Sequence, residues 1–283
     1  MTDAVTHKIT DQALHWKPGQ LDGVSLMRAE FQRFVFARHS HDTFALGVIE
    51  KGAQRFRHGG ATHTAPTGAI ITVNPDEVHD GETAAPDGYQ YRMAYIEADR
   101  IREILSGIYG DGACLQFFPQ PVTRDHELAA KLRSALLCLE SGRSSGALES
   151  QSLFYQTVGE LFQHHGRRRQ TPAVLSENRG AVDRAIEFIR ENALADLSLE
   201  EIAAAAGLSR FHFLRLFRKS TGLPPHAYLI QRRVEIARRA IEKGASLSRA
   251  AMEAGFSDQS HLTRRFKAIY GIPPGRYRRT ILS

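Results

Sequence analysis

AAMEAGFSDQSHLTRRFKAIYGIPPGRYR, residues 250–278, repeats a pattern that the chain has already used at residues 202–229, IAAAAGLSRFHFLRLFRKSTGLPPHAYL. The small and apolar residues that open each copy, with a leucine three residues earlier, have the i, i+3, i+4, i+7 spacing of one helix face. Gly207 and Gly255 then suit the left-handed position at which a helix ends. The two copies predict two short helices of the same kind.

A second helix is expected after each glycine turn. Phe213 and Phe217 in the first copy, and Leu262 and Phe266 in the second, are spaced i and i+4, so each pair predicts a buried stripe. The alanines of the first helix are small enough to let the two helices approach closely. A short helix, a glycine turn and a second helix are typical of a helix-turn-helix, and the chain has two.

The ends of each second helix are also marked in the sequence. Ser209 and Ser257 stand in the two turns, where a serine can cap the helix that follows. Gly222 and Gly271 suit the other end. The Pro-Pro pair after each of these glycines cannot extend a helix, but it can begin the next one.

The outer face of each second helix is expected to enter the major groove of DNA. Arginine can bridge O6 and N7 of guanine, glutamine can pair with adenine, and an apolar side chain can touch a thymine methyl. Basic residues further along each helix suit phosphates. A plain solvent-facing surface is the alternative. The predicted DNA-binding residues are Arg210, Phe211, Leu214, Arg215 and Arg218, and Gln259, Ser260, His261, Arg264 and Lys267.

Residues 224–244, PPHAYLIQRRVEIARRAIEKG, connect the two units with apolar residues at helical spacing. About twenty helical residues at 1.5 Å each span ~30 Å. One turn of B-DNA measures ~34 Å. The connection therefore predicts a rigid helix that holds two recognition helices in successive major grooves.

Charge divides the chain in the same way as the repeat does. Residues 171–283 carry 19 Lys and Arg against 11 Asp and Glu, whereas residues 1–170 carry 18 against 20. The excess positive charge lies in the half with the repeat, which favours a polyanion partner for that half.

The repeated half resembles the DNA-binding domain of the AraC/XylS family of transcriptional regulators, most specifically over residues 250–278. The resemblance implies seven helices that form two helix-turn-helix units joined by one long helix. Leu214 departs from the family pattern, which usually has a polar residue there. By position, the resemblance places base contacts on Phe211, Leu214, Arg215, Gln259, Ser260, His261 and Arg264.

The other half predicts strands. Residues 10–100 hold short, often alternating apolar runs separated by Gly and Pro, which favours an antiparallel sandwich or barrel. Alternation places His39 and His41 on one face of a strand, and His79 follows about forty residues later. Three converging histidines can bind a metal. Neutral histidines that line a pocket or are hydrogen-bonded in the barrel are the alternative that we favour.

The same stretch resembles the cupin motif, and AraC-type regulators often carry a cupin-like N-terminal barrel that binds a small effector. Ala45 or Leu46 stands where metal-binding cupins have a glutamate, and Glu77 replaces an expected glycine. We therefore expect no metal, no cofactor and no catalytic residues, but a pocket of aromatic and polar side chains. The predicted effector-binding residues are Trp16, His39, His41, Phe44, His79, Arg92 and Tyr95.

Residues 125–165 predict an antiparallel helical pair joined by a Gly/Ser loop at 141–146. The resemblance implies that this part dimerises. Its predicted apolar stripes are Leu128, Leu132, Leu136 and Leu139, then Leu148, Leu153, Val158 and Leu161. The expected domains are a cupin-like effector-binding and dimerisation domain (1–165), a polar linker (166–180) and an AraC-type DNA-binding domain (181–283).

The sequence thus predicts an α+β protein of two domains: a cupin-like β-barrel with a helical dimerisation segment, and an all-α double helix-turn-helix. The predicted function is a sequence-specific transcriptional regulator that senses a small molecule and is not an enzyme. A cupin-fold metalloenzyme with a tethered DNA-binding domain, and an architectural DNA-binding protein without effector, are the alternatives.

The expected partners are double-stranded DNA, a small-molecule effector, a second copy of the chain and RNA polymerase. The two cysteines have no metal spacing, and the N-terminus lacks a signal-peptide pattern. No apolar run approaches the length of a membrane span. These features predict a cytoplasmic location with no membrane partner.

Overall fold

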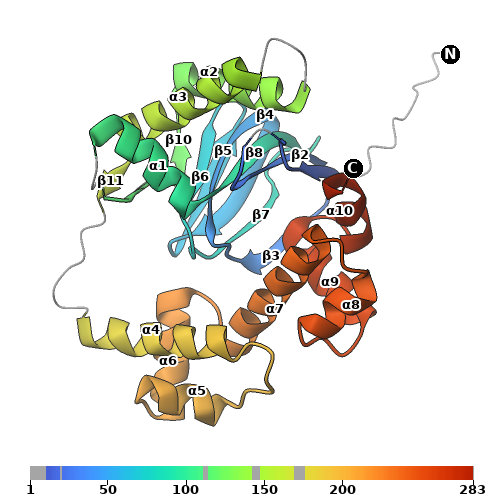
Figure 1. The fold of residues 1–283 in the computed structure, drawn as a ribbon. Coiled ribbons are helices and arrows are strands. Elements are labelled where there is room, and N and C mark those ends of the chain that lie inside the picture. The colour runs from blue at the N-terminus through green and yellow to red at the C-terminus, as the bar shows by residue number, and fades with distance from the viewer. Residues whose placement is uncertain (1–10, 20, 111–113, 142–146, 169–175, 283) are drawn as a thin grey trace.

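A β-barrel and a group of helices lie one above the other in the computed structural model, which describes residues 11–19, 21–110, 114–141, 147–168 and 176–282 (Figure 1). The predicted two-part α+β architecture is confirmed. The strands are β1 (Gln12–Trp16), β2 (Val24–Phe31), β3 (Phe36–His39), β4 (Thr43–His58), β5 (Ala61–Pro66), β6 (Ile70–Val73), β7 (His79–Thr83), β8 (Tyr89–Glu97), β9 (Gln116–Phe117), β10 (Val122–Thr123) and β11 (Arg167–Arg168).

The long strand β4 organises the barrel. Its first part pairs with β8 and β6, and its second part pairs with β5 and β7, so one strand passes from one sheet layer into the other. The passage lies near Gly52, whose φ is +71°. A side chain there would place Cβ 2.0 Å from the carbonyl oxygen of Gly88, so only glycine fits. Along the main sheet the strand order is β1-β2-β8-β4-β6-β10.

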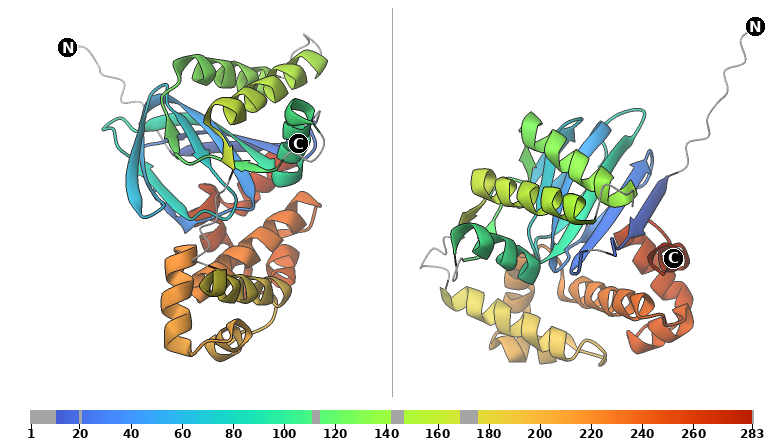
Figure 2. Two further views of the ribbon diagram at one scale, coloured as in Figure 1. Left: turned by 90° about the vertical axis from the view of Figure 1, so that its left-hand side faces the viewer. Right: turned by 45° about the horizontal axis from the view of Figure 1, so that its top comes forward.

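Alternate residues of these strands serve two different cores. Leu26, Leu46 and Ile96 point to the outer face, which α1 (Ala98–Tyr109), α2 (His126–Ser141) and α3 (Ala147–His165) cover (Figure 2). Met27, Ala45 and Met93 point into the barrel. The helical pair α2 and α3 agrees with the sequence, whereas α1 was not predicted. Leu148 was wrongly placed on a buried stripe, since it is 75% exposed at the start of α3.

Seven helices follow within residues 176–282, as the family resemblance implied. They are α4 (Ser176–Glu191), α5 (Leu199–Ala206), α6 (Arg210–Thr221), α7 (Pro225–Glu242), α8 (Leu247–Glu253), α9 (Gln259–Tyr270) and α10 (Pro274–Ile281). Helix α4 begins inside the segment predicted as linker, and β11, which pairs with β9, also lies inside it. The remainder of that segment, 169–175, lies outside the described residues.

The two helix-turn-helix units end and begin as their repeated strings predict. Gly222 and Gly271 close α6 and α9 in the left-handed conformation, and Pro225 and Pro274 open the helices that follow. The tyrosine three residues after each proline packs back on the recognition helix, because Tyr228 contacts Phe217 and Tyr277 contacts Phe266, with ring centres 5.6 and 5.2 Å apart.

The predicted serine caps of the recognition helices are not formed. Ser209 occupies the cap position of α6 but makes no side-chain hydrogen bond to the helix. In the second unit the cap is Asp258, whose carboxylate accepts from the backbone amide of His261. The extra residue in the second turn puts Asp258, rather than Ser257, at the helix start.

The open end of the barrel rests on α7, α9 and α10 (Figures 1 and 2). Apolar side chains of both halves, among them Phe31 and Phe36 in the barrel and Ile272 after α9, form one continuous buried cluster. The approach is close, since a side chain at Gly271 would place Cβ 2.9 Å from the ring of Phe31. The described helices include none that is both long and apolar enough to cross a membrane.

Candidate DNA-binding and effector sites

The two recognition helices bury one face and leave the opposite face open. Phe213 and Phe217 of α6, and Leu262 and Phe266 of α9, are fully buried. Phe211, in the first turn of α6, is 82% exposed. A phenylalanine left in water at the start of a recognition helix is placed to contact an apolar surface such as a thymine methyl.

The predicted DNA-binding residues fall on these open faces, with two differences in exposure. Leu214 and His261 are half-buried. His261 Nε2 accepts a long hydrogen bond from Arg265 Nε (3.4 Å), and burial and the charges of Arg265 and Arg264 lower the pKa of this ring. The exposed ones are Arg210, Phe211, Arg215, Arg218, Gln259, Ser260, Arg264 and Lys267.

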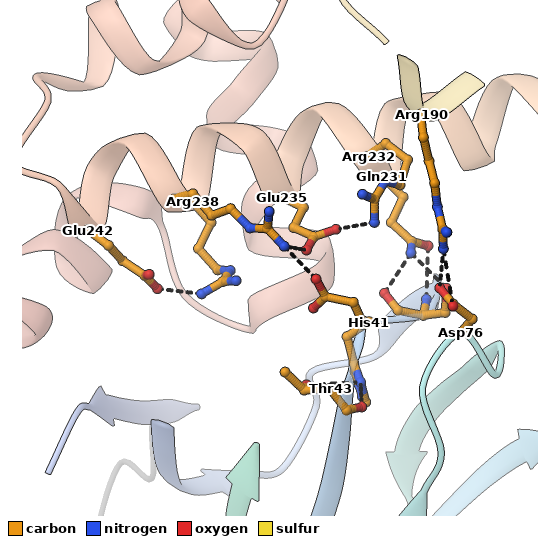
Figure 3. Close-up of polar contacts among 12 residues, drawn as sticks. His41, Thr43, Asp76, Arg190, Gln231, Arg232, Glu235, Arg238 and Glu242 are labelled. Atoms are coloured by element: carbon orange, nitrogen blue, oxygen red, sulfur yellow. Dashed lines mark hydrogen bonds and ion pairs between the residues drawn. The ribbon is translucent and has the colours of Figure 1, made fainter. Parts of the chain in front are cut away.

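Helix α7 is joined to the barrel by one buried side-chain amide. Gln231 Oε1 accepts from the backbone amide of Ser40 (2.9 Å), while Nε2 donates to the carbonyl oxygen (2.6 Å) and to Oγ (2.8 Å) of the same residue (Figure 3). Both residues are buried. Removing one partner would leave buried backbone groups unsatisfied, which costs ~1–3 kcal/mol.

Ion pairs surround this buried contact. Arg239 of α7 pairs with Asp42, and Arg190 of α4 pairs with Asp76 (Figure 3). Glu242 at the end of α7 pairs with Lys17. The basic partners are partly exposed, so each pair contributes at most ~1 kcal/mol. They fix the register of the docking more than its strength.

A carboxyl pair faces the cavity between the halves. Burial raises the pKa of Glu235 on α7, and the hydrogen bond and negative charge of Asp42 raise it further. Burial opposes ionisation of Asp42 as well, but its hydrogen bond with Glu235 and the charge of Arg239 outweigh this and hold its pKa low. The contact between the two groups thus favours the protonated form of Glu235 and the ionised form of Asp42, while Arg232 and Arg239 donate to the Glu235 carboxyl group.

The cavity itself is small, about 50 Å³, and both halves of the molecule line it. A water molecule needs ~10–15 Å³ by this measure, so the space holds a few waters or a ligand of a few atoms. The barrel contributes His15, Ser25, His39, Ser40, His41, Asp42, Thr43 and Tyr95, and the helical half contributes Gln231, Val234, Glu235, Arg238, Ile269, Tyr270 and Tyr277.

Three histidines meet at the mouth of the barrel. The register of β3 and β7 pairs His39 with His79, and their ring centres are 4.3 Å apart. The His41 ring centre lies 5.1 Å from that of His79. In the three rings Nδ1 lies 2.7, 2.8 and 3.0 Å from a backbone carbonyl oxygen two residues away. A carbonyl oxygen only accepts, so the proton of each neutral ring is on Nδ1 and Nε2 keeps a lone pair.

These rings are neutral at pH 7. Burial lowers the pKa of His39 to about 4 and that of His41 to about 3, and it holds the pKa of His79 well below its usual value. The buried Nε2 of His41 makes no hydrogen bond within the described part of the chain. The site therefore offers hydrogen-bond acceptors to whatever enters it.

The structure brings together some, but not all, of the predicted effector-binding residues. His39, His41 and Tyr95 line the cavity, and together with His79 they line a second space of about 40 Å³ directly inside the barrel. Trp16 and Phe44 instead pack in the outer core against the helices, and Arg92 pairs there with Glu50. Strand alternation turns these three side chains to the outer face, away from the cavity.

Several lining residues were not predicted from the sequence. Gln231, Glu235 and Arg238 belong to a helix that reads only as a spacer between recognition helices, and no local pattern marks them as facing the barrel. His15 had a signal in the sequence, since it lies two residues after Ala13 and therefore on the same face of β1.

No metal-sized cluster forms from the three barrel histidines in the described residues. The group that does place three ligand atoms within 4.8 Å is Asp125, His164 and His165, on the far side of the barrel at the ends of α2 and α3. Its carboxylate is already engaged, because Asp125 Oδ1 accepts from Leu128 N and Oδ2 lies 3.0 Å from His165 Nε2.

Known proteins resemble both halves of this chain. Residues 23–158 match the family model of AraC-like ligand binding domains, and residues 202–280 match that of helix-turn-helix domains. YbfI, an HTH-type transcriptional regulator of Bacillus subtilis (strain 168), is 30% identical over 227 residues, or 80% of this chain and 81% of YbfI. MarA, the multiple antibiotic resistance protein of Escherichia coli (strain K12), is 33% identical over 114 residues, or 40% of this chain and 85% of MarA.

A solved structure shares the whole fold. ToxT from Vibrio cholerae strain SCE256, with an unsaturated fatty acid bound, superposes with a TM-score of 0.59 over 96% of this chain and 95% of ToxT, at 10% identity. The matched models and relatives cover the barrel as well as the helices. The chain belongs to the AraC family of transcriptional regulators, with an N-terminal ligand-binding domain and a C-terminal helix-turn-helix DNA-binding domain.

Proposed function

We propose that this regulator senses a small molecule in the cavity between barrel and α7 and transmits its presence to the two recognition helices through α7. The observation that carries the proposal is the shared wall: Gln231, Glu235 and Arg238 line the cavity from the same helix that spaces α6 and α9. A ligand there would contact both the barrel and the helix that spaces the two recognition helices.

The lining favours an effector that donates hydrogen bonds. Nε2 of His39 and Nε2 of His41 are acceptors in this cavity, Nε2 of His79 is an acceptor in the adjoining space inside the barrel, and Asp42 adds a carboxylate to the cavity wall. A hydroxyl-rich or amino-bearing molecule satisfies these groups. The fatty acid in the ToxT structure supports small-molecule binding by this fold, but at 10% identity it does not identify the effector of this chain.

The size of the cavity supports the proposed mechanism. Most ligand pockets measure ~300–1,000 Å³, far above the space of about 50 Å³ found here. An effector larger than a few atoms must move α7 relative to the barrel, or displace side chains between them. Its binding therefore favours one arrangement of the two halves by its difference in affinity for each.

We assign the base contacts to the open faces of α6 and α9. Phe211 and Arg215 would contact bases from α6, and Gln259, Ser260 and Arg264 from α9. Arg210, Arg218 and Lys267 suit phosphates. Leu214 and His261, being half-buried, would add shorter-range contacts.

The remaining functional features are also proposals. A second copy of the chain would associate through the outer helices, where Leu148 is an exposed apolar residue on α3. The protein would act in the cytoplasm and contact RNA polymerase while bound to DNA. It would catalyse no reaction, and we favour this role over the alternatives of a cupin metalloenzyme and an architectural DNA-binding protein. We place the end of the sensor at about residue 165, where α3 ends, and the DNA-binding domain at 181–283 after a linker.

Acid is expected to destabilise the docked protein. His15, His39, His41 and His79 have pKa values lowered by burial, so the unfolded state binds more protons than the folded state below their usual pKa of ~6.5. Their stabilisation is complete above pH ~6.5 and is lost as the pH falls toward about 4. Glu235 has the opposite sign, but it is a single group against four.

The melting temperature measured at closely spaced pH values checks this expectation. It should fall between pH ~6.5 and 5 in the wild type, and less steeply in His41→Gln. The control His212→Gln alters an exposed ring on α6 and should leave the slope unchanged. A melting temperature that rises over this range would contradict neutral buried histidines.

A ligand screen tests the effector site. Thermal shifts of the full chain are measured with pairs of small polyols and their fully O-methylated counterparts, which keep the carbon skeleton but donate no hydrogen bond. A polyol that fits should raise the melting point, by up to ~2.7 kcal/mol of stabilisation at a hundredfold excess over Kd. Its methylated counterpart should not, and His41→Phe should abolish the shift. Equal shifts from both members of a pair would show that the acceptors do not select the ligand.

DNA readout is tested at Arg264. Duplexes selected from a random-sequence library by the wild type serve as specific DNA, and scrambled versions as non-specific DNA. Arg264→Ala should weaken specific binding by ~1–3 kcal/mol and scrambled binding much less. Arg102→Ala, on α1, removes the same charge away from the recognition helices and should change neither. Retained sequence preference in Arg264→Ala would remove this residue from the base contacts.

A further inference from the structure

One arginine of α7 bridges the two helix-turn-helix units. Arg233 Nε donates to the carbonyl oxygen of Ala193 (2.8 Å), and Nη2 donates to that of Ala195 (2.8 Å). Nη1 donates to the carbonyl oxygen of Gly255 (2.9 Å). The first two acceptors lie in the turn between α4 and α5, and the third lies in the turn between α8 and α9.

The acceptors suit a guanidinium because of where they stand in the fold. Ala193 and Ala195 follow the end of α4, and Gly255 follows the end of α8. These carbonyl groups belong to the two turns and not to the ladder of either helix. The planar fork of arginine can satisfy carbonyl groups of both turns at once.

The bridge requires a glycine at its far end. Gly255 has a φ of +72°, and a side chain there would place Cβ 3.3 Å from Cζ and Nε of Arg233 and 3.6 Å from the carbonyl oxygen of Leu194. The turn of the second unit and the turn before α5 of the first unit thus lie side by side, with the guanidinium between them.

The apolar cores do not supply the same connection. The first unit packs Ile202, Phe213 and Phe217 in one buried cluster, whereas the second packs Ala250, Leu262 and Phe266 in the cluster that continues into the barrel. Each core fastens its own unit to α7, so α7 sets the distance between the units. The rotation of one unit relative to the other about this helix is fixed where both turns are held together.

We propose that Arg233 is a positioning residue that sets the relative orientation of the two recognition helices, and through it the half-site spacing that the protein accepts. It points into the carbonyl cluster and contacts no DNA in this proposal. The inference rests on the DNA-binding faces assigned above, since spacing has meaning only if both α6 and α9 bind.

The test measures affinity against half-site spacing. Duplexes selected by the wild type are remade with the spacing between half-sites lengthened or shortened by one and two base pairs, and one duplex keeps a single half-site. Arg233→Met removes the three donors but keeps an unbranched stem of similar width. Arg184→Met is the matched control, because Arg184 Nη2 donates to the carbonyl oxygen of Ala206 within the first unit alone (2.8 Å).

The wild type should lose about tenfold or more in affinity when the spacing changes by one base pair, which is ~1.4 kcal/mol. Arg233→Met should lose about tenfold at the native spacing, differ by less than about threefold across the series, and bind the single half-site as the wild type does. Arg184→Met should keep the wild-type dependence on spacing, whatever its overall affinity.

The outcomes separate the two proposals. A wild type that selects no DNA, or only single half-sites, would contradict the two-helix DNA interface and remove the basis of this inference. A wild type that is sensitive to spacing, with an Arg233→Met variant that is equally sensitive, would overturn the role of Arg233 alone. If Arg233→Met fails to fold by circular dichroism, Arg233→Lys replaces it. A lysine cannot hold both turns in one plane, so the proposal expects a flattened spacing profile from it as well.

Discussion

The buried contact between Gln231 and Ser40 joins the barrel to α7, the helix that also spaces the two recognition helices. An amide side chain in the middle of α7 satisfies the backbone amide, the carbonyl and the hydroxyl of one barrel residue, all out of water. Losing only some of these hydrogen bonds would leave buried polar groups unsatisfied, which costs free energy. We therefore expect the hydrogen bonds between the barrel and α7 to form or break together. The same helix spaces α6 and α9, so it links the barrel to both recognition helices, in addition to the direct contacts of the barrel with α4, α9 and α10.

The chemistry beside that contact explains how such a helix can be sensitive to a small molecule. The cavity is nearly filled by its own side chains, and its acceptors are satisfied only in part, as the buried Nε2 of His41 illustrates. Asp42 of the barrel and Glu235 of α7 line the same cavity from opposite sides, and Asp42 helps to raise the pKa of Glu235. A ligand that donates hydrogen bonds to these groups would satisfy acceptors that lack a partner among the described residues. It would do so at the surface where the barrel and the helices meet.

The sequence predicted the features that are written locally. The repeated glycine and Pro-Pro strings fixed the ends of the recognition helices, and helical spacing identified Phe213, Phe217, Leu262 and Phe266 as their buried faces. The sequence indicated that His39, His41 and His79 could converge, whereas the pairing of His39 with His79 between β3 and β7 was known only from the structure. Caps were less reliable, since one inserted residue moved the cap of α9 from Ser257 to Asp258.

Features that depend on distant parts of the chain were not predictable in this way. Phe44 and Arg92 were predicted to line the pocket, but they lie on the outer face of the sheet. The sequence alone does not show which face of a strand the helices cover. Gln231 meets Ser40 across 191 residues, and Arg233 meets Gly255 only because two separately folded turns lie against each other. In both cases the residue type is ordinary for a helix surface, and only the three-dimensional arrangement gives it a role.

The backbone amide of Ser40 offers the most direct test of coupling, because Gln231 of α7 is its hydrogen-bond partner and Ser40 is buried. Coupling between two sites is reciprocal. If ligand binding in the barrel changes the affinity of the recognition helices for DNA, then DNA binding must also change the barrel. Hydrogen–deuterium exchange of the segment containing Ser40 should therefore change when selected duplex DNA is added to the full chain, and scrambled DNA should change it much less. Identical exchange with and without specific DNA would contradict transmission through α7.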